Sequence, residues 1–244
     1  MKFAIKTFSA ALLAGAALTA LPATAQVAGI ATLDTTDAIM QTKAFAQAYQ
    51  QIGTTFTSNS QMIQAKRKEI NDINAQLDTN KDKNLTQDEL DAAIKAKNPL
   101  LTQLEAKERE IAQLQQPIVT AQAFAVESIA DRYAAAQQQV ITQKKINMIL
   151  APDAFIWAPE AVDVTKAVTA ALDLAVPSVG ITPPANWQPK QSTGGLYEQI
   201  QQRLLTAARV QAIRNAQAQQ AVQPAANPAA PATPAPQQPQ PESR

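Results

Sequence analysis

The sequence predicts a mainly α-helical fold with a small β body, in which a long antiparallel helical hairpin projects from a short-stranded oligomerisation core. Three observations predict this class. Ala and Gln are abundant while only 6 of the 244 residues are Gly, a composition that favours long helices. Two long stretches carry apolar residues at helical spacing. The runs typical of strands are few and short.

Residues 1–25 have the features of a secretory signal peptide. Lys2 and Lys6 precede an apolar run, and small residues up to Ala25 form a cleavage pattern before Gln26. The run is shorter than the roughly 20 apolar residues that span a bilayer. We therefore expect cleavage between Ala25 and Gln26, export to the periplasm and no transmembrane anchor in the mature chain.

Composition then divides the mature chain into four regions. They are a folded domain at 26–174, with its body at 26–35 and 146–174 and its hairpin at 36–145, a Pro-rich linker at 175–194, an amphipathic helix at 195–221 and a disordered tail at 222–244 rich in Ala, Pro and Gln. Proline removes backbone donors, and segments with little apolar surface cannot offset the entropy cost of ordering. The helix is predicted because its apolar residues recur every three to five positions.

The first strand and the first limb of the hairpin follow the signal peptide. The segment Val27–Asp34 is β-branched and apolar, which predicts a strand. The pattern is then helical from Asp37 to Leu77, with Thr35 or Thr36 as the capping residue.

The second limb runs from Leu90 to Lys145. Pro99 is placed to begin a new helix, whereas Pro117 lies inside the helical pattern and should kink it. Both limbs carry apolar residues at heptad-like spacing, which predicts a seam between them. These residues are Ile63, Ile70, Ile73 and Leu77 on the first limb and Leu100, Leu104, Ile111, Leu114 and Ile118 on the second.

Two further strands and a helix complete the predicted body. The strands are Ile146–Leu150 and Ala154–Ala158, separated by a turn at Pro152. A helix is expected from Thr165 through Leu172. A chain with so few strands leaves sheet edges open, and oligomerisation is the simplest way to cover them.

Residues 78–89 reproduce the spacing of an EF-hand calcium loop. The candidate ligands are Asp78, Asn80 and Asp82 at loop positions 1, 3 and 5, Asn84 through its carbonyl at position 7, Thr86 through water at position 9 and Glu89 at position 12. Position 6 favours Gly because φ is positive there, yet Lys83 occupies it. The loop could bind Ca²⁺ weakly, at about 10⁻⁴ to 10⁻³ M. It could also be a degenerate loop without metal, or a chance match in a polar turn.

The composition excludes most catalytic chemistry. Cys and His are absent, so the chain has no thiolate, no imidazole base and no usual zinc, haem or iron–sulfur ligand set. No phosphate-binding loop or nucleophilic Ser motif is present. The formal net charge is only +1, without the clustered Lys and Arg that nucleic acid binding requires. We therefore expect neither an enzyme nor a nucleic-acid partner, and no required cofactor.

The order of these elements resembles a known family. The residues that carry the resemblance are Ile30–Asp34, Asn147–Leu150, Ala154–Ala158 and Val162–Thr165, placed around a long polar hairpin. In this order they resemble the Skp/OmpH family of periplasmic chaperones over about residues 27–174. The resemblance implies a homotrimer whose hairpins enclose a cavity for unfolded outer-membrane proteins, which it holds without ATP.

Two features depart from that family. Its hairpins are often basic, whereas Asp37 to Lys145 contains 13 basic and 13 acidic residues, and the EF-hand-like loop is the second departure. Apolar contacts would then have to dominate client binding. Candidates for these contacts are Met62, Ile63, Phe124 and Tyr133. The alternative is that these residues only pack in the seam between the limbs. The alternative function is a structural or envelope-associated coiled-coil protein with a calcium response.

Overall fold

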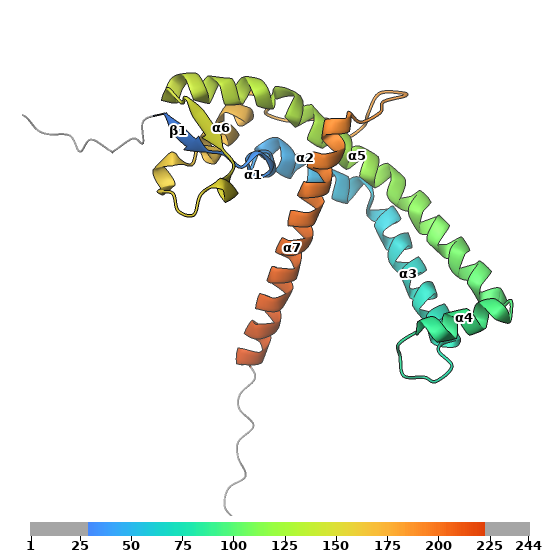
Figure 1. The fold of residues 1–244 in the computed structure, drawn as a ribbon. Coiled ribbons are helices and arrows are strands. Elements are labelled where there is room, and N and C mark those ends of the chain that lie inside the picture. The colour runs from blue at the N-terminus through green and yellow to red at the C-terminus, as the bar shows by residue number, and fades with distance from the viewer. Residues whose placement is uncertain (1–28, 223–244) are drawn as a thin grey trace, which may run out of the picture. The chain divides into compact units, whose positions relative to one another are not determined.

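The structure is a computed structural model that describes residues 29–222. The signal peptide, its cleavage site and the tail from residue 223 onward lie outside the described residues. The chain divides into two compact units, one ending at Ala185 and the other beginning at Asn186. The first unit contains the β body and the helical hairpin (Figure 1).

The β body is a two-stranded parallel sheet. Strand β1 (Ile30–Thr32) pairs with β2 (Met148–Leu150), and Ile30 lies opposite Met148. The strands can be parallel because the whole hairpin connects them. On its other side β1 forms a single parallel bridge from Thr32 to Asp163. The two ends of the hairpin are therefore fastened at one sheet.

The Asp-Val-Thr sequence fixes helix α6 (Thr165–Ala175) to β1. The Val164 amide donates to the Thr32 carbonyl at 2.9 Å, and the Asp34 amide donates to Thr165 Oγ1 at 3.1 Å. Asp163 Oδ1 accepts from the Thr165 amide at 2.8 Å and so satisfies one of the free donors at the start of α6. These bonds connect the three residues of the Asp-Val-Thr sequence to strand β1, to Asp34 and to the first turn of α6.

The first limb is three helices rather than the single predicted helix. They are α1 (Thr35–Met40), α2 (Lys43–Thr55) and α3 (Thr57–Leu77). The cap of α1 is Asp34, whose Oδ1 accepts from the Asp37 amide at 2.9 Å, so the prediction of Thr35 or Thr36 was wrong. Thr42 caps α2, because its hydroxyl accepts from the Phe45 amide.

The second limb consists of a short helix at the tip and a long return helix. Helix α4 (Gln87–Lys95) ends before Asn98, which caps α5 (Pro99–Lys144) with Pro99 as its first residue. Helix α5 passes through Pro117 and bends along its length (Figure 1). The long helices and the small sheet confirm the predicted fold class.

The seam between the limbs is buried on the side of α3. Ile63, Ile73 and Leu77 are buried there, as the spacing predicts. Leu100 and Leu104 of α5 pack against the cluster that contains Ile73 and Leu77. Near the body, helices α2 and α5 pack through the small side chains of Ala48, Ala121 and Ala125, together with Ile52.

The prediction of a strand at Ala154–Ala158 was wrong. A short 3₁₀ helix, η1 (Pro152–Ala154), is followed by irregular chain and a second one, η2 (Glu160–Val162). One side of β1 pairs with β2 and the other with Asp163, so β1 offers this segment no free edge. Pro152 and Pro159 also remove two backbone donors that a strand would use.

The chain after α6 has no helix or strand until α7 (Gln191–Val222). Residues 176–185 nevertheless belong to the first unit, where Val176 and Ile181 are buried. Within residues 29–222, no helix is both long and apolar enough to cross a membrane.

Candidate functional site

The EF-hand-like loop lies at the hairpin tip, between α3 and α4 (Figure 1). Leu85, at the apolar position 8 of the loop, packs into a cluster that fixes the tip. The cluster contains Ile73, Leu77 and Ala93 as buried residues, with Leu85, Leu100, Leu101 and Leu104 packed against them. The loop is thus held from α3, α4 and α5 together, and its polar residues lie outside this apolar support.

Asp78 organises the first half of the loop. Its carboxylate accepts from the Lys81 amide at 2.7 Å and from the Lys83 amide at 2.8 Å. Lys83 has φ +69°, the left-handed conformation expected at position 6 of an EF-hand loop, and Lys81 has φ +58°. The chain therefore makes the sharp turn with Lys where Gly would adopt the same φ at lower cost.

Asn80, Asp82 and Asn84 form two successive side-chain turns. Asn80 Oδ1 accepts from the Asp82 amide at 2.8 Å, and Asp82 Oδ1 accepts from the Asn84 amide at 2.7 Å. The Asn80 amide group also donates to Asp82 Oδ2 at 3.1 Å. The side chains at positions 1, 3 and 5 therefore hold the loop by hydrogen bonds to its own backbone.

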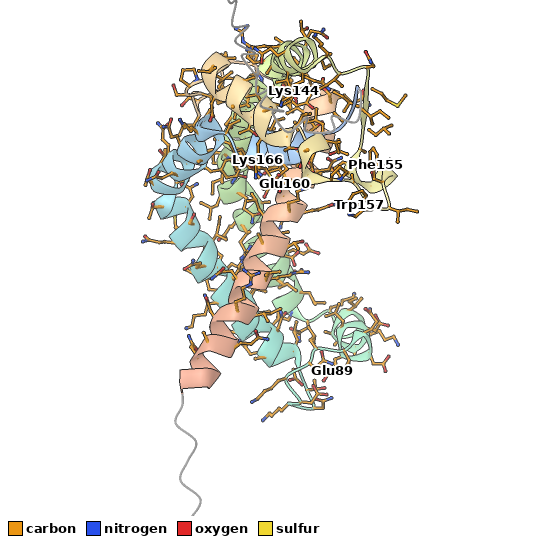
Figure 2. The ribbon with its side chains drawn as sticks, turned by 90° about the vertical axis from the view of Figure 1, so that its left-hand side faces the viewer. Glu89, Lys144, Phe155, Trp157, Glu160 and Lys166 are labelled. Carbon is orange, nitrogen blue, oxygen red and sulfur yellow. The ribbon has the colours of Figure 1, made fainter. Side chains whose placement is uncertain are left out.

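Glu89 clamps the two ends of the loop (Figure 2). Its Oε1 accepts from the amide and hydroxyl of Thr79, at 2.8 and 2.9 Å, and from the Asn80 amide at 3.2 Å. Its Oε2 accepts from the amide and hydroxyl of Thr86, which completes a capping box at the start of α4. The donors at Thr86, Asn80 and Thr79 favour the ionised carboxylate and lower the pKa of Glu89 to about 2.

The loop thus brings together all five predicted ligand residues, Asp78, Asn80, Asp82, Asn84 and Glu89, but as a hydrogen-bonded turn. In the part of the chain that the structure describes, no group of three acidic side chains is arranged to hold a metal ion. A cation at this loop would require Glu89 to release the amides of Thr79 and Asn80. The carboxylate oxygens of Asp78 and Asp82 each accept one of these hydrogen bonds, which leaves lone pairs of the kind that a hard cation binds.

Charged side chains connect the two limbs halfway along the hairpin. Lys66 Nζ lies 2.9 Å from Glu110 and 3.3 Å from Glu69, and Lys107 Nζ lies 2.9 Å from Glu69 and 3.6 Å from Glu110. Hydrogen bonds from Lys66 and Lys107 lower the pKa of the Glu110 and Glu69 carboxyl groups. The sequence alone does not show this pairing, because contacts across the seam depend on the register of the two helices.

Of the four predicted client-contact residues, only Met62 is exposed, with 43% of its surface accessible. Ile63 is buried in the seam. Tyr133 is half-buried, and its hydroxyl lies 2.8 Å from Thr35 Oγ1. Phe124 is also half-buried. Ile63 therefore packs inside the seam between the two limbs and is not available for contact with an unfolded protein.

A second apolar surface was missed because its segment was expected to be a strand. Ile156 is fully exposed, and Trp157, which is labelled in Figure 2, is 79% exposed. Both residues follow strand β2 by a few positions in the sequence. Ile30 and Met148, which face each other in the sheet, are exposed as well. We call these four residues the body patch. Large apolar side chains that are exposed are candidates for contact with another chain.

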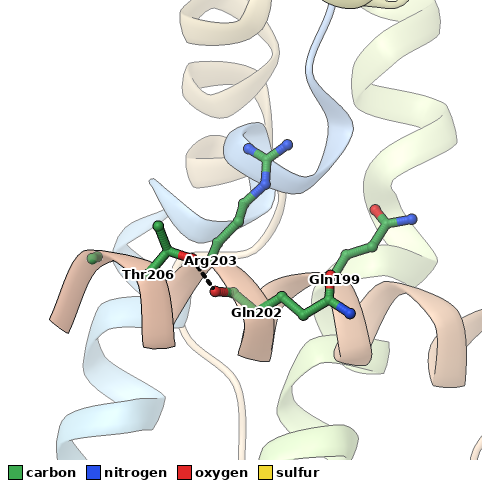
Figure 3. A pocket seen from close by; sticks show the side chains of 5 residues that line it. Gln199, Gln202, Arg203 and Thr206 are labelled. Carbon is green, nitrogen blue, oxygen red and sulfur yellow. Dashed lines mark hydrogen bonds between the residues drawn. The ribbon is translucent and has the colours of Figure 1, made fainter. Parts of the chain in front are cut away.

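An open hollow lies along α7 in the second unit (Figure 3). Its volume is about 560 Å³, and Gln199, Gln202, Arg203, Thr206 and Ala207 line it. Thr206 Oγ1 donates to the Gln202 carbonyl at 2.9 Å. These lining residues offer amide, hydroxyl and guanidinium groups but no carboxylate, so they supply no acid–base pair.

Comparison with known proteins gives one family. The model of the family described as outer membrane protein (OmpH-like) matches residues 29–172, from the start of the β body to α6. Among solved structures, the chain is similar to a proposed outer membrane chaperone (OmpH-like) from Caulobacter crescentus CB15. The identity is 20%, the match covers 62% of this chain and 87% of that chain, and the TM-score is 0.41. No curated protein matches the chain.

Proposed function

The chain belongs to the OmpH-like family, and on that premise we propose that it is an ATP-independent periplasmic chaperone. It binds unfolded outer-membrane proteins and prevents their aggregation, without a catalytic step. The observation that carries this proposal is the match of a single family model across the β body and both limbs of the hairpin.

The surface of the hairpin supports weak binding to many sequences. Met62 on α3, Ile94 on α4 and Val119 on α5 are 43%, 55% and 41% exposed and lie on three different helices. Dispersed apolar contacts hold unfolded chains without selecting one sequence, whereas a deep pocket would select a shape. The limb charges are balanced, so these contacts carry more of the binding than charge does.

The functional form in this proposal is a homotrimer assembled through the body patch. A two-stranded sheet is marginally stable by itself, and the exposed Ile156 and Trp157 provide apolar surface beside it. Burying these side chains between copies would remove them from water and cover the open edge of β2. Three hairpins projecting from one body would then surround a client.

The proposed holding activity is tested by diluting an unfolded β-barrel outer-membrane protein out of urea and following turbidity without ATP. We expect the mature chain to keep the barrel protein soluble. Replacing Met62, Ile94 and Val119 by Ser should reduce this effect, because the dispersed apolar contacts are removed. The matched control replaces exposed polar residues of the same helices, Gln61, Lys95 and Gln113, by Ser and should retain it.

Aggregation that proceeds unchanged in an excess of the wild-type chain would contradict the proposal. That result would favour the alternative, a structural or envelope-associated coiled-coil protein. Equal loss in the apolar and polar triple variants would instead show that holding does not use the apolar contacts.

Calcium binding at residues 78–89 stays a prediction. The φ of Lys83 and its amide bond to Asp78 match what position 6 of such a loop requires. Calorimetric titration of the mature chain with calcium, compared with Glu89→Gln, tests it. A heat of binding that the variant lacks would support the site, and no difference at millimolar calcium would end the idea.

A further inference from the structure

The apolar cluster between α2 and α5 is completed by a segment that belongs to neither helix. Four of its five buried residues lie on the helices, Ala48 and Ile52 on α2 and Ala121 and Ala125 on α5. The fifth is Ile181, which comes after α6 in the chain. Protein interiors are close-packed, and the short alanine side chains leave space that the branched side chain of Ile181 takes. The two helices therefore accept an apolar side chain from a third segment.

Residues 178–182, which we call the cover segment, carry apolar side chains at alternate positions. Ile181 is buried, and Val179 is half-buried and packs against the same cluster. The residues between and beside them are exposed, namely Ser178, Gly180 and Thr182. A two-residue period is that of an extended chain with one apolar face. The family match ends at residue 172, so the cover segment lies outside the matched domain.

The cover segment is held by side chains rather than by its backbone. Among the backbone hydrogen bonds of residues 29–222, none involves residues 177–185. Pro177 and Pro183, on either side of the segment, have no amide donor. Another extended chain with apolar side chains at the same spacing could therefore replace it without breaking a backbone hydrogen bond of the protein.

We propose that the cluster between α2 and α5 is a binding site for an extended polypeptide with apolar side chains at every second position, and that the cover segment occupies this site as a competitor within the chain. Under the function proposed above, on which this inference rests, that polypeptide is an unfolded outer-membrane protein. The strands of such barrels alternate apolar and polar residues with the same two-residue period. Their apolar side chains would take the places of Val179 and Ile181.

Competition from within the chain sets which polypeptides the site can hold. The cover segment follows α6, which ends at Ala175, and this short connection keeps it beside the cluster. Short connections of this kind give effective concentrations on the order of mM. A short free peptide would rarely displace the cover segment, whereas a long unfolded chain that contacts the hairpin at several points could. When those other contacts are lost, the cover segment returns to the cluster and favours release.

A peptide copy of the cover segment tests this proposal. A fluorescent peptide with the sequence of residues 176–184 is added to the full mature chain, and its binding is followed by fluorescence anisotropy. The chain is compared with Ile181→Ser, which weakens the competitor. Thr182→Ser, at an exposed neighbouring position, is the matched control. A second peptide, with Ser in place of Val179 and Ile181, controls for binding that does not use the apolar side chains.

We expect Ile181→Ser to bind the peptide about tenfold more tightly than the unsubstituted chain and Thr182→Ser, because a site that is open a tenth of the time has about tenfold weaker apparent affinity. The peptide with two Ser should bind none of the three. Adding Ala121→Leu to Ile181→Ser should remove the gain, because the longer side chain fills the space in the cluster.

Equal affinity of Ile181→Ser and the unsubstituted chain for the peptide, at equal helix content, overturns the proposal. A gain in affinity that Ala121→Leu leaves unchanged overturns it as well, because the peptide then binds elsewhere. If Ile181→Ser lowers the helix content, Val179→Ser takes its place under the same criterion.

The peptide measurement is independent of the aggregation measurement. If Ile181→Ser gains affinity for the peptide while an unfolded barrel protein still aggregates, the binding site stands and the chaperone function fails. If the barrel protein stays soluble while Ile181→Ser gains no affinity, the chaperone function stands and the competitor is overturned.

Discussion

Glu89 holds both ends of the tip loop through a carboxylate that accepts from Thr79, Asn80 and Thr86. All of these donors favour the ionised form, so protonation removes the bonds that they make. Because the pKa is lowered in the folded loop, ionised Glu89 stabilises the loop fully above its ordinary value of 4.5. This stabilisation is lost as the pH falls toward about 2.

We therefore expect the Glu89 carboxyl to titrate near pH 2 in an NMR pH series, with the Asn80 and Thr86 amides losing protection from exchange over the same range. Glu89→Gln should expose these amides to exchange at neutral pH. A neutral side-chain amide has one acceptor oxygen, which is a weaker hydrogen-bond acceptor than an ionised carboxylate. Glu105→Gln, on the surface of α5, is the control and should leave the loop unchanged. A Glu89 carboxyl that titrates at its ordinary value, with no change in amide protection, would contradict the clamp.

Two glycines should respond to Ala in opposite directions. Gly29 has φ +79°, and a Cβ there would lie 2.3 Å from Asn147 Nδ2. Gly29→Ala should lower the free energy of unfolding by at least about 1–2 kcal/mol, the cost of a left-handed conformation. Gly53→Ala, in an open position of α2, should raise it by about 0.5–1 kcal/mol. Urea unfolding of both variants measures these changes, and equal effects would show that the contact with Asn147 is not formed.

At the scale of elements, the register of the two limbs is fixed by charges as well as by the apolar seam. Lys66→Glu places a like charge against Glu69 and Glu110 and should lower the melting temperature. Adding Glu110→Lys restores opposite pairing and should recover most of the loss. Lys68→Glu, at an exposed position of α3, changes the net charge equally and is the control. Full additivity of the two substitutions would show that the ion pairs across the seam contribute nothing.

These same pairs should depend on pH and salt. The pKa values of Glu69 and Glu110 are lowered by hydrogen bonds from the lysines, so the pairs stabilise the hairpin above pH 4.5 and lose this effect as the pH falls below it. High salt should weaken them at neutral pH, since the side chains are partly exposed. Thermal unfolding at pH 7 and pH 3, with and without added salt, measures both effects.

Helices could be predicted from the sequence better than strands, for a physical reason. The long apolar periodicities located α3 and α5, and Pro99 gave the start of α5 correctly, because helices depend on neighbouring residues. The segment 154–158 has strand composition, but among the described residues β1 is already paired on both sides and Pro152 and Pro159 flank the segment. Which strands pair depends on contacts between distant residues, which the composition of one segment does not show. The break at Phe56 follows Gly53, a residue of low helix propensity, and Phe56 packs against the cluster of Ala48, Ile52, Ala121 and Ala125.

The candidate site was predictable only in part. The spacing of Asp78 to Glu89 and the positive φ at position 6 followed from sequence alone. That Glu89 binds the loop amides could not be foreseen, because its partners are fixed by how α4 begins. The packing of Val179 and Ile181 could not be foreseen either, because a Pro-rich segment gives no sign that these side chains reach a cluster between α2 and α5.

At the scale of the whole molecule, assembly through the body patch should be sensitive to its largest side chain. Trp157→Ser removes apolar surface without disturbing a helix or strand, since residue 157 lies in neither. We expect this variant to shift the sedimentation profile from the assembled form toward single copies, with unchanged helix content. Leu174→Ser, at another exposed apolar residue of the same unit, is the control. A profile that is the same for both variants would place the interface elsewhere.

Multi-angle light scattering of the mature chain, mixed with an unfolded barrel protein after dilution from urea, measures whether several copies of the chain together shelter the barrel protein. We expect one soluble species whose mass equals three chains plus one barrel protein. A chain that elutes alone with the mass of a single copy, while the client is recovered in the pellet, would contradict it.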